Sequence, residues 1–408
     1  MVAWKVDTSI VEKLDSKIMI PLFAIVAVDA IGAGVILPLL PFYALHFGCT
    51  PIVLGILVAS FALSQFIAAP WIGQLSDQHG RKPILLVSQC GTFLSLILLA
   101  CANNLWLLFI ARIIDGITSG NISVAAALAI DHSTQRTRKQ AIGVISAAIG
   151  VGMVIGPSLS SVLVRYSITA PIWGAACLSA LSFFTTWLML NKNTSRPSNV
   201  TVTKAEISIW KFRDIAGLPQ VLAILAAFYL VMAMYISQAA LFLSSRFSFH
   251  SQPFGPKEIG IVFACSGAIN IFVQLVAIKK IGRIINDKMI SVWGFVFLGS
   301  GFIILGTAQT LVTLATSIIL ISLGGSVIRP TLTAALTNLV PRSQQGAIMG
   351  LNTSIMAMFN VLGPLIAGVA INRGWYAGWA YSLFAISACA TLFMVGFIIN
   401  RVWPLATQ

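Results

Sequence analysis

The sequence is poor in charge, and poorest in acidic residues. Charged residues make up 9% of its 408 positions, whereas hydrophobic residues make up 58%. A soluble chain of this length would need far more charge on its surface, so the composition excludes an ordinary soluble protein. Asp and Glu number 11 against 25 Lys and Arg, which gives a net charge of +14. Because the basic residues stand between long apolar runs, this imbalance does not indicate a nucleic-acid partner.

Several signatures of catalysis and processing are also missing. The six cysteines lie far apart, mostly in apolar runs, and form neither a metal-ligand pattern nor a disulfide framework. The chain has no Walker-type phosphate loop, so ATP is not expected to act within it. Without a nucleophile–base set or metal-ligand spacing, we expect no enzyme activity, no cofactor and no metal site. The first apolar run is too long for a cleavable signal and lacks a small-residue cleavage site.

Apolar runs of about the length of a bilayer span recur twelve times. They predict an all-α membrane protein with 12 transmembrane helices, multi-pass in the inner (plasma) membrane, with the lipid bilayer as a partner. The runs cover residues 18–42, 52–75, 83–101, 105–131, 139–165, 170–190, 218–246, 257–279, 288–309, 311–339, 346–372 and 376–402.

The distribution of basic residues predicts the orientation. Twelve spans place both termini on one side of the membrane. With the termini inside, most Lys and Arg fall in cytoplasmic segments, and the outer loops and helix ends hold only Arg165, Arg246, Lys257 and Arg373. Positive residues are enriched on the cytoplasmic side, so we expect both termini to be cytoplasmic.

A long polar connection divides the chain into two halves. Residues 191–217, NKNTSRPSNVTVTKAEISIWKFRDIAG, predict a cytoplasmic linker between a six-helix bundle at 1–190 and another at 218–408. The segments 141–163 and 347–369 echo each other, and both carry a late Gly-Pro. Internal repeats related by a pseudo-two-fold axis are typical of secondary transporters, which hold their substrate between the repeats near the midplane.

The connection after the second run reads GQLSDQHGRKPIL (73–85) and resembles the helix 2–3 signature of the major facilitator superfamily. Its glycines permit a tight turn between two helices. The resemblance implies a cytoplasmic gate made of Gly73, Asp77, Gly80, Arg81 and Asp131. Alternatively, Arg81 and Lys82 only anchor the topology. We favour the gate because Asp77 adds nothing to the topology signal.

The fifth run carries Gly143, Gly152, Gly156 and Pro157, and resembles the helix-5 signature of antiporters in this superfamily. Serines replace the last two glycines of that signature. Glycines at this spacing let helices approach closely, and proline loosens the backbone ladder. Ordinary small-residue packing explains the same pattern without implying a direction of transport.

The fourth run, LFIARIIDGITSGNISVAAALAID (108–131), resembles the helix-4 proton-coupling motif, with Asp115 where the motif usually has Gln. In one continuous helix, Arg112, Asp115, Gly116, Ser119 and Ser123 would share an inward polar face. Arg112 and Asp115 could simply neutralise each other and hold the bundle. We favour proton coupling because buried ions are costly as purely structural devices.

Asp29 is the only charge within the first run. It stands ~17 Å along a helix from Ile18, close to the bilayer centre. Desolvation would keep a lone carboxyl neutral there, whereas water, or Arg112 if the first and fourth spans adjoin, would favour the ionised form. A proton affinity that changes with conformation is what coupling requires. The alternative is a simple helix–helix hydrogen bond, which Asn would make at lower cost.

The segments VDAIGAGVILPLLP, GRKPILL and ARIIDGITSGNISVAAALAID resemble tetracycline/proton antiporters. The eighth and ninth spans lack the acidic and His residues of tetracycline carriers, so the resemblance extends to the wider group of twelve-helix drug/proton antiporters. It implies a monomer that exports amphipathic organic compounds in exchange for protons by alternating access, with Asp29, Arg112 and Asp115 as the proton-coupling residues.

Aromatic, Met and amide side chains of the second half suit a large apolar substrate with few polar handles. The candidates are Tyr229, Tyr235, Gln238, Asn270, Gln274, Arg329, Asn352, Met356, Phe359 and Asn360. The same residues can also serve only to pack helices. Arg329 either faces the cavity and favours an anionic group, or snorkels to the cytoplasmic surface.

Two other functions remain open. One is a dedicated transporter of a single metabolite, such as a siderophore or another anionic natural product, which Arg329 and the shortage of acids in the second half favour. The other is a non-transporting membrane receptor or assembly factor. Such a protein would not need Asp29, Arg112 and Asp115 together.

Overall fold

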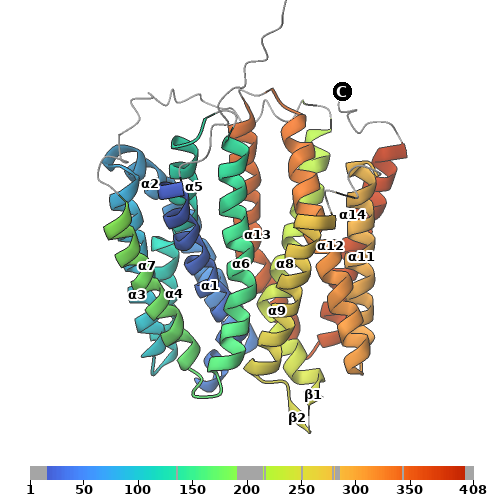
Figure 1. Cartoon of the computed structure of the whole chain (residues 1–408). Helices are drawn as coiled ribbons and strands as arrows, with labels where there is room; N and C mark the ends of the chain where they lie inside the picture. The colour runs from blue at the N-terminus through green and yellow to red at the C-terminus, as the bar shows by residue number, and fades with distance from the viewer. Residues whose placement is uncertain are drawn as a thin grey trace, which may run out of the picture.

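The chain forms one bundle of long helices with a small β-hairpin at one end, as Figure 1 shows for the computed structural model. The structure describes residues 16–134, 137–190, 215, 217–249, 251–277, 280, 285–341 and 344–399, so the predicted linker at 191–217 lies outside it apart from 215 and 217. Within the described residues, 12 segments are long and apolar enough to cross a membrane, which confirms the predicted fold class.

The described elements match the predicted runs to within a few residues at most boundaries. They are α1 (Ser16–His46), α2 (Pro51–His79), α3 (Arg81–Ala100), α4 (Leu105–Thr118), α5 (Asn121–Asp131), α6 (Arg138–Leu163), α7 (Ala170–Met189), α8 (Leu218–Arg246), β1 (Ser248–Phe249), β2 (Gln252–Pro253), α9 (Pro256–Phe272), the π-helix η3 (Val273–Ala277), α11 (Asp287–Thr307), α12 (Leu311–Asn338), α13 (Gln345–Asn372) and α14 (Tyr376–Ile399).

The fourth span is broken rather than continuous. Ser119 leaves the helical conformation with ψ 53°, and the Gly120 N–H donates to the Thr118 carbonyl at 2.7 Å. Ser, Gly and Asn compete with or weaken helical hydrogen bonding, which explains a break at Ser119-Gly120-Asn121. The expectation that one uninterrupted face runs from Arg112 to Ser123 is therefore wrong, because Ser123 belongs to a separate helix.

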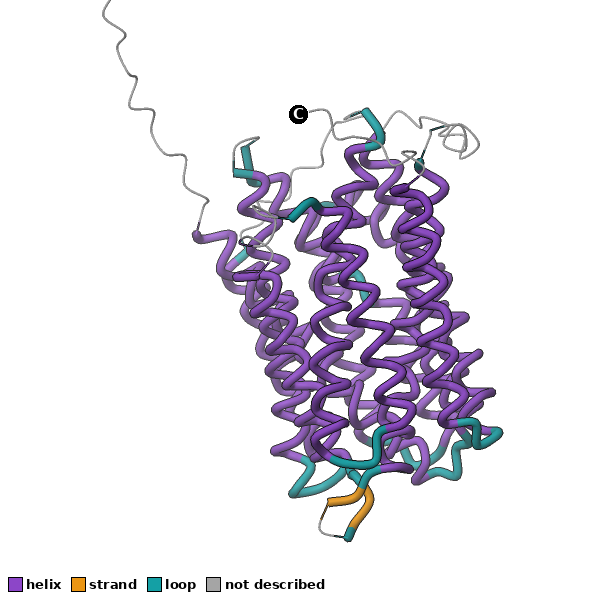
Figure 2. Tube along the Cα trace, turned by 90° about the vertical axis from the view of Figure 1, so that its right-hand side faces the viewer, coloured by secondary structure: helices purple, strands orange, loops and turns teal. Residues whose placement is uncertain are grey.

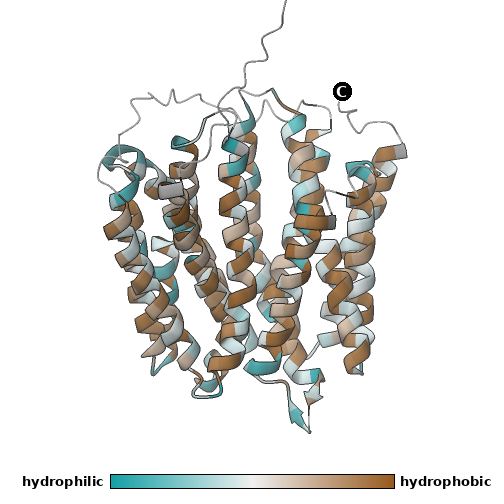
Figure 3. Ribbon diagram, in the orientation of Figure 1, coloured by the Kyte–Doolittle hydropathy of each residue, from teal (hydrophilic) through white to brown (hydrophobic). Residues whose placement is uncertain are grey.

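The bundle has two distinct ends. The terminal end, at the top of Figure 1, holds the start of α1 and the end of α14, and the hairpin end holds the antiparallel pair β1–β2. Figure 2 shows helices that extend between these ends, with most loops gathered at one end or the other. In Figure 3 the middle of the bundle is mainly hydrophobic and the hydrophilic residues lie towards its ends, as expected for a chain that crosses a membrane.

The two halves meet backbone to backbone at the hairpin end. A Cβ on Gly55 of α2 would overlap the carbonyl oxygen of Pro364 on α13, and one on Gly368 would lie 2.8 Å from the Pro51 carbonyl oxygen. The Gln238 amide on α8 also donates to the Pro51 carbonyl at 3.3 Å. Only glycine allows this approach, so the crossing of α2 and α13 depends on Gly55 and Gly368.

A second crossing joins the halves through α6 and α9. A Cβ on Gly260 would lie 2.8 Å from the carbonyl oxygen of Pro157, and one on Gly267 would lie 2.9 Å from that of Met153. Because α9 begins directly after the hairpin, this contact also belongs to the hairpin-end half of the bundle. The two crossings hold the halves together at the same end.

Glycines of the terminal end lack such contacts. A Cβ on Gly73, Gly143 or Gly350 would meet no described atom within 4 Å. Gly143 and Gly350 are equivalent positions of the sequence repeat, whereas the Gly-Pro dipeptides of the same repeat are closely packed. The described glycine crossings between the halves therefore lie at the hairpin end and not at these three positions of the terminal end.

Cys49 offers a test of closure at the hairpin end. It lies between α1 and α2, is 3% exposed, and burial raises its pKa to about 11. With all other cysteines replaced by serine, its reaction with a membrane-impermeant maleimide should accelerate about tenfold per pH unit up to about pH 10, because the thiolate fraction keeps growing. A rate that levels off near pH 9 would mean that the thiol is exposed.

Gly55→Ala should loosen the same end. Overpacking a close contact costs about 1–3 kcal/mol, so the halves should separate more often at the hairpin end. We expect maleimide labelling of Cys49 at fixed pH to rise roughly fivefold or more. Gly396→Ala is the matched control, because a Cβ there meets no described atom within 4 Å. Equal labelling in the two variants would contradict the proposed role of this crossing.

Candidate functional site

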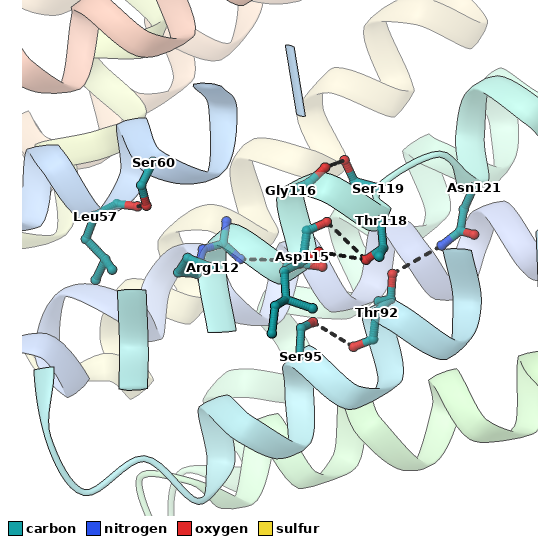
Figure 4. A network of polar contacts seen from close by, with 11 residues as sticks. Leu57, Ser60, Thr92, Ser95, Arg112, Asp115, Gly116, Thr118, Ser119 and Asn121 are labelled. Atoms are coloured by element: carbon teal, nitrogen blue, oxygen red, sulfur yellow. Dashed lines mark hydrogen bonds and ion pairs between the residues drawn. The ribbon is translucent and has the colours of Figure 1, made fainter. Parts of the chain in front are cut away.

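Asp29 is held by a neutral amide in the middle of the bundle. Its Oδ1 accepts a hydrogen bond from Asn121 Nδ2 at 2.8 Å, and the same nitrogen donates to Thr92 Oγ1 at 3.3 Å. Figure 4 shows the Asn121–Thr92 contact between the first turn of α5 and α3. Asn121 is 2% exposed, and its Oδ1 is buried without a partner. The site therefore pairs a carboxyl with an amide that has one unused acceptor.

Close packing of α1 against α6 sets the position of Asp29. A Cβ on Gly152 would overlap Ala30, and a Cβ on Gly156 would lie 2.5 Å from the Ile31 carbonyl oxygen. The glycines of the helix-5 motif, which lie on α6, thus pack against the face of α1 that includes Ala30 and Ile31. Asp29 lies beside this contact between α1 and α6, and its hydrogen-bond partner, Asn121, comes from α5.

One side of Asp29 is not packed against another helix. Asp29 is partly buried, Ala33 one turn further along is exposed, and a Cβ on Gly32 would meet no described atom within 4 Å. Residues four apart share a helix face, so the open side runs along α1 from Asp29 to Ala33. The packing beside Asp29 is therefore looser towards Gly32 and Ala33 than along the crossing with α6.

Arg112 is paired with Asp115, not with Asp29. Arg112 Nη1 donates to Asp115 Oδ2 at 2.7 Å, and the two side chains are 9% and 13% exposed. The guanidinium also lies over the Phe61 ring, 4.1 Å from its centroid. Figure 4 shows the pair on α4, just before the break. Asp29 and Asp115 are close enough for their charges to repel each other.

The structure brings together the charged residues of the predicted gate. Arg81 Nη1 lies 2.6 Å from Asp77 Oδ1, and Arg81 Nε donates to Asp131 Oδ2 at 3.0 Å. Gly80, with φ 93°, is the single residue between α2 and α3, and this conformation favours glycine. Gly73 has open space beside it. The cluster thus joins the ends of α2 and α5 to the start of α3.

Lys82, the neighbour of Arg81, has a different task. It is buried, and its Nζ donates to the carbonyls of Trp187, at 2.9 Å, and of Leu190. A cation at the carbonyl end of a helix is favourable, so Lys82 caps α7. Its charge is used for helix packing as well as for topology.

Some predicted substrate residues are joined across helices, and others belong to the core of the second half. Tyr229 on α8 donates to Asn352 Oδ1 on α13 at 3.1 Å. Tyr235 is 8% exposed and stacks on Trp379, with 6.3 Å between ring centroids. Gln238 lies at the crossing between the halves. The described contacts therefore place Tyr229 and Asn352 together and separate Tyr235 and Gln238 from them.

The remaining substrate candidates lie along α9, η3, α12 and α13. Asn270 donates to the Ser266 carbonyl of its own helix at 3.1 Å, and Gln274 is exposed within the π-helix η3. Arg329 is exposed one turn after Gly325, where a Cβ would lie 3.7 Å from Met232 Sδ of α8. The partly buried members on α13 are Met356, Phe359 and Asn360. No described contact joins these residues into a single cluster.

Sequence reasoning missed Asn121 and Thr92. The available signal was the triplet Ser119-Gly120-Asn121 inside an apolar run, because turn-forming residues there predict a local break. Which atom the amide would contact depends on how α1, α3 and α5 pack, and no pattern in the sequence gives that. Within the described residues, no group of three or more His, Cys, Asp or Glu side chains is placed to hold a metal ion.

Comparison with known proteins agrees with this architecture. The family model of the Major Facilitator Superfamily matches residues 22–292 and 247–405. The "Tetracycline resistance protein, class G" of Vibrio anguillarum is 30% identical over 383 residues, which cover 89% of this chain and 93% of that protein. "Multidrug resistance protein 2" of Bacillus subtilis is 26% identical over 395 residues, 95% of each chain.

A solved structure has the same fold at low sequence identity. The nucleoside transporter NupG superposes with a TM-score of 0.79 at 12% identity, covering 93% of this chain and 99% of that one. NupG shows the fold alone, whereas the family model and the resistance-protein relatives make the chain a transporter and not an enzyme. Its 12 described apolar helices are those of a multi-pass inner-membrane protein. With a family model that matches most of its length, the chain belongs to the Major Facilitator Superfamily.

Proposed function

We propose that the protein exports amphipathic organic compounds from the cytoplasm by alternating access, driven by the counterflow of protons. Family membership supports transport, and relatives named for tetracycline and multidrug resistance support export of drug-like compounds. The observation that carries proton coupling is Asp29, a mid-membrane carboxyl held by the neutral side chain of Asn121.

A neutral partner suits a group that must gain and lose a proton. Breaking a buried ion pair leaves an uncompensated charge, which is strongly unfavourable. Arg112 is already neutralised by Asp115 at 2.7 Å. Asp29 can therefore change its charge without breaking that pair.

The two ends of the bundle supply the alternating gates. In this proposal the glycine crossings close the hairpin end, and the terminal end, where the described glycines make no such crossing, admits substrate from the cytoplasm. We infer that substrate and proton compete for the region of Asp29. Substrate from the cytoplasm would displace the proton, and proton binding from the outside would reset the protein.

The substrate region in this proposal lies between Asp29 and α13. Tyr229 and Asn352 provide a joined hydroxyl and amide, while Met356 and Phe359 provide apolar surface. Gln274 adds an exposed amide in the π-helix, and π-helical turns are frequent at functional sites. Few polar groups on a largely apolar surface match a large amphipathic ligand.

One feature favours a dedicated transporter of an anionic metabolite as the second candidate. Arg329 follows Gly325 by one turn, and Gly325 faces Met232 of α8. A cation on that face of α12 would attract a carboxylate or a similar group. The flux assays below distinguish the two functions, because a dedicated anion transporter would leave lipophilic cations such as ethidium in place.

Asp29→Asn should abolish coupling and spare exchange. The amide mimics the protonated carboxyl in shape and hydrogen bonding. In proteoliposomes with an imposed pH gradient, uphill flux of tetracycline and ethidium should fall by a factor of about 10². Counterflow exchange without a gradient should persist, because it needs no net proton movement.

The control for this test is Asp287→Asn, which removes an exposed carboxylate at the start of α11 and should leave uphill flux unchanged. Substrate should also release protons from the purified wild-type protein, because the coupling is reciprocal. The Asp29→Asn protein should release fewer protons when the same substrate binds. Undiminished uphill flux in Asp29→Asn at equal expression would transfer the role to Asp115.

Asp77→Asn should weaken the gate at the terminal end. It removes the carboxylate 2.6 Å from Arg81, and an exposed ion pair is worth up to about 1 kcal/mol. Because the described state already makes this pair, we infer that the pair strengthens when the terminal end closes. Its loss should therefore lower the population of the outward-facing state several-fold, with the protein still inserted. Maleimide labelling of Gly350→Cys from the cytoplasmic side should rise, and labelling of Cys49 from outside should fall. If both rates and the flux stay unchanged, the loop is only a topology signal.

A further inference from the structure

We propose that Asn121 is a positioning residue that partners Asp29 in both protonation states, and that α5 carries the change to the gate at Arg81. This inference rests on the proposed proton coupling at Asp29. Nothing in the sequence motifs assigns a role to Asn121 or treats α5 as a separate mechanical element. The geometry of both ends of α5 points to it.

The first step is the hydrogen-bond inventory of Asn121. Its Nδ2 has two hydrogens, and both are directed to acceptors: Asp29 Oδ1 at 2.8 Å and Thr92 Oγ1 at 3.3 Å. Its Oδ1 is buried and has no partner, although the residue is only 2% exposed. Because Oδ1 makes no hydrogen bond, the amide can turn over without breaking one on that side.

The protonated form of Asp29 provides that state. An ionised carboxylate can only accept hydrogen bonds, whereas a protonated one needs an acceptor for its hydroxyl. A half-turn of the Asn121 amide exchanges Nδ2 and Oδ1, and thereby offers an acceptor in place of a donor. The Thr92 hydroxyl both donates and accepts, so it can partner the amide in either orientation.

The second step is the position of Asn121 in the chain. It is the first residue of α5, directly after the break at Ser119 and Gly120. Asp131 is the last residue of the same helix, and it accepts from Arg81 Nε at 3.0 Å. One continuous helix of 11 residues therefore has the partner of Asp29 at one end and a member of the gate at the other.

The break makes α5 able to move separately from α4. The helical hydrogen bonds are interrupted at Ser119 and Gly120, so α5 can tilt without taking Arg112 and Asp115 with it. In this proposal a protonated Asp29 holds the amide less tightly than the carboxylate does, so the first turn of α5 can shift against α1, and the helix transmits the shift to Asp131. Coupling of this kind needs a two-state element, which the reorienting amide provides.

No other described charge competes for Asp29. From α4, Asp115 faces it, and Arg112 neutralises Asp115. The helices packed against α1 are α5, α6, α7, α8 and α9, and their charged residues stand in first or last turns, far from mid-helix. These residues are Asp131, Arg138, Lys139, Arg246, Lys257 and Glu258.

The test measures whether the gate follows pH through Asn121. In reconstituted protein without native cysteines, Gly350→Cys reports on the terminal end. Its maleimide rate is measured at about pH 5.5 and about pH 8, each divided by the rate of the same protein unfolded in detergent, which removes the intrinsic pH dependence of the thiol. In this background we expect the ratio of the two normalised rates to be about tenfold, as one hydrogen bond to a charged group allows.

Asn121→Leu should reduce this ratio to about one, because an apolar side chain pairs with neither form of Asp29. Asn121→Asp has the shape of Asn, so it serves if the Leu variant does not fold. Two facing carboxyls would share one proton across this pH range, which also removes the response.

Gln89→Leu is the matched control. Gln89 is another 2% exposed amide with an unpaired oxygen, but it donates to Ser182 at 2.9 Å and contacts no carboxyl. Its variant should keep the tenfold ratio.

The outcomes separate the inference from the proposed function. If Asn121→Leu and Asn121→Asp keep the pH response while Asp29→Asn loses it, the role of Asn121 is refuted and proton coupling at Asp29 stands. If Asp29→Asn itself keeps the response, the proposed coupling at Asp29 fails. If Gln89→Leu loses the response as well, the effect is a general loss of packing, and the inference is overturned.

Discussion

Hydrocarbon offers no hydrogen-bond partner, and this constraint determines where polar groups lie throughout the bundle. Many hydroxyls inside the spans bond to carbonyls of their own helix, as Ser326 does to Ser322 at 2.5 Å and Thr331 to Val327 at 2.7 Å. The charge on Arg112 is matched three residues later by Asp115. Against this background a carboxyl with only an amide for a partner, as at Asp29, is a deviation that requires a functional reason.

The same constraint explains why the break in the fourth span lies where it does. A broken helix leaves backbone groups unpaired, and at membrane depth it is tolerated only inside protein or beside a water-filled space. Here the break is surrounded by α2, α3 and α1, and Gly120 lies so close to Ile72 that a Cβ would come within 2.5 Å of its Cγ2. The interruption is therefore buried, and it places the first turn of a short helix beside Asp29.

Much of the fold could be predicted from the sequence, because span length and hydropathy are local properties. The twelve helices follow from runs that need no tertiary information, whereas the charge cluster of Asp77, Arg81 and Asp131 was implied only by the resemblance of residues 73–85 to the superfamily signature. The pairing of Asp29 with Asn121 could not be predicted, because it depends on a break that a continuous helical projection ignores. The contacts of the substrate candidates also depend on tertiary packing: Tyr229 bonds to Asn352, whereas Tyr235 stacks on Trp379 and Gln238 bonds to Pro51, and residue type does not distinguish these cases.

The two ends of the bundle are held by interactions of different kinds, and this difference suits proton control. At the hairpin end, Gly55 and Gly368 let backbones touch, and such contact is steric and independent of pH or salt. At the terminal end, Arg81 holds carboxylates that are 45% and 43% exposed, and exposed pairs contribute only up to about 1 kcal/mol each. One unit of pH changes the free energy of a titrating group by about 1.4 kcal/mol. In the proposed mechanism a single proton therefore has an energy comparable with that of the charged gate, whereas the glycine crossings contain no titrating group and respond only to a change in how the halves pack.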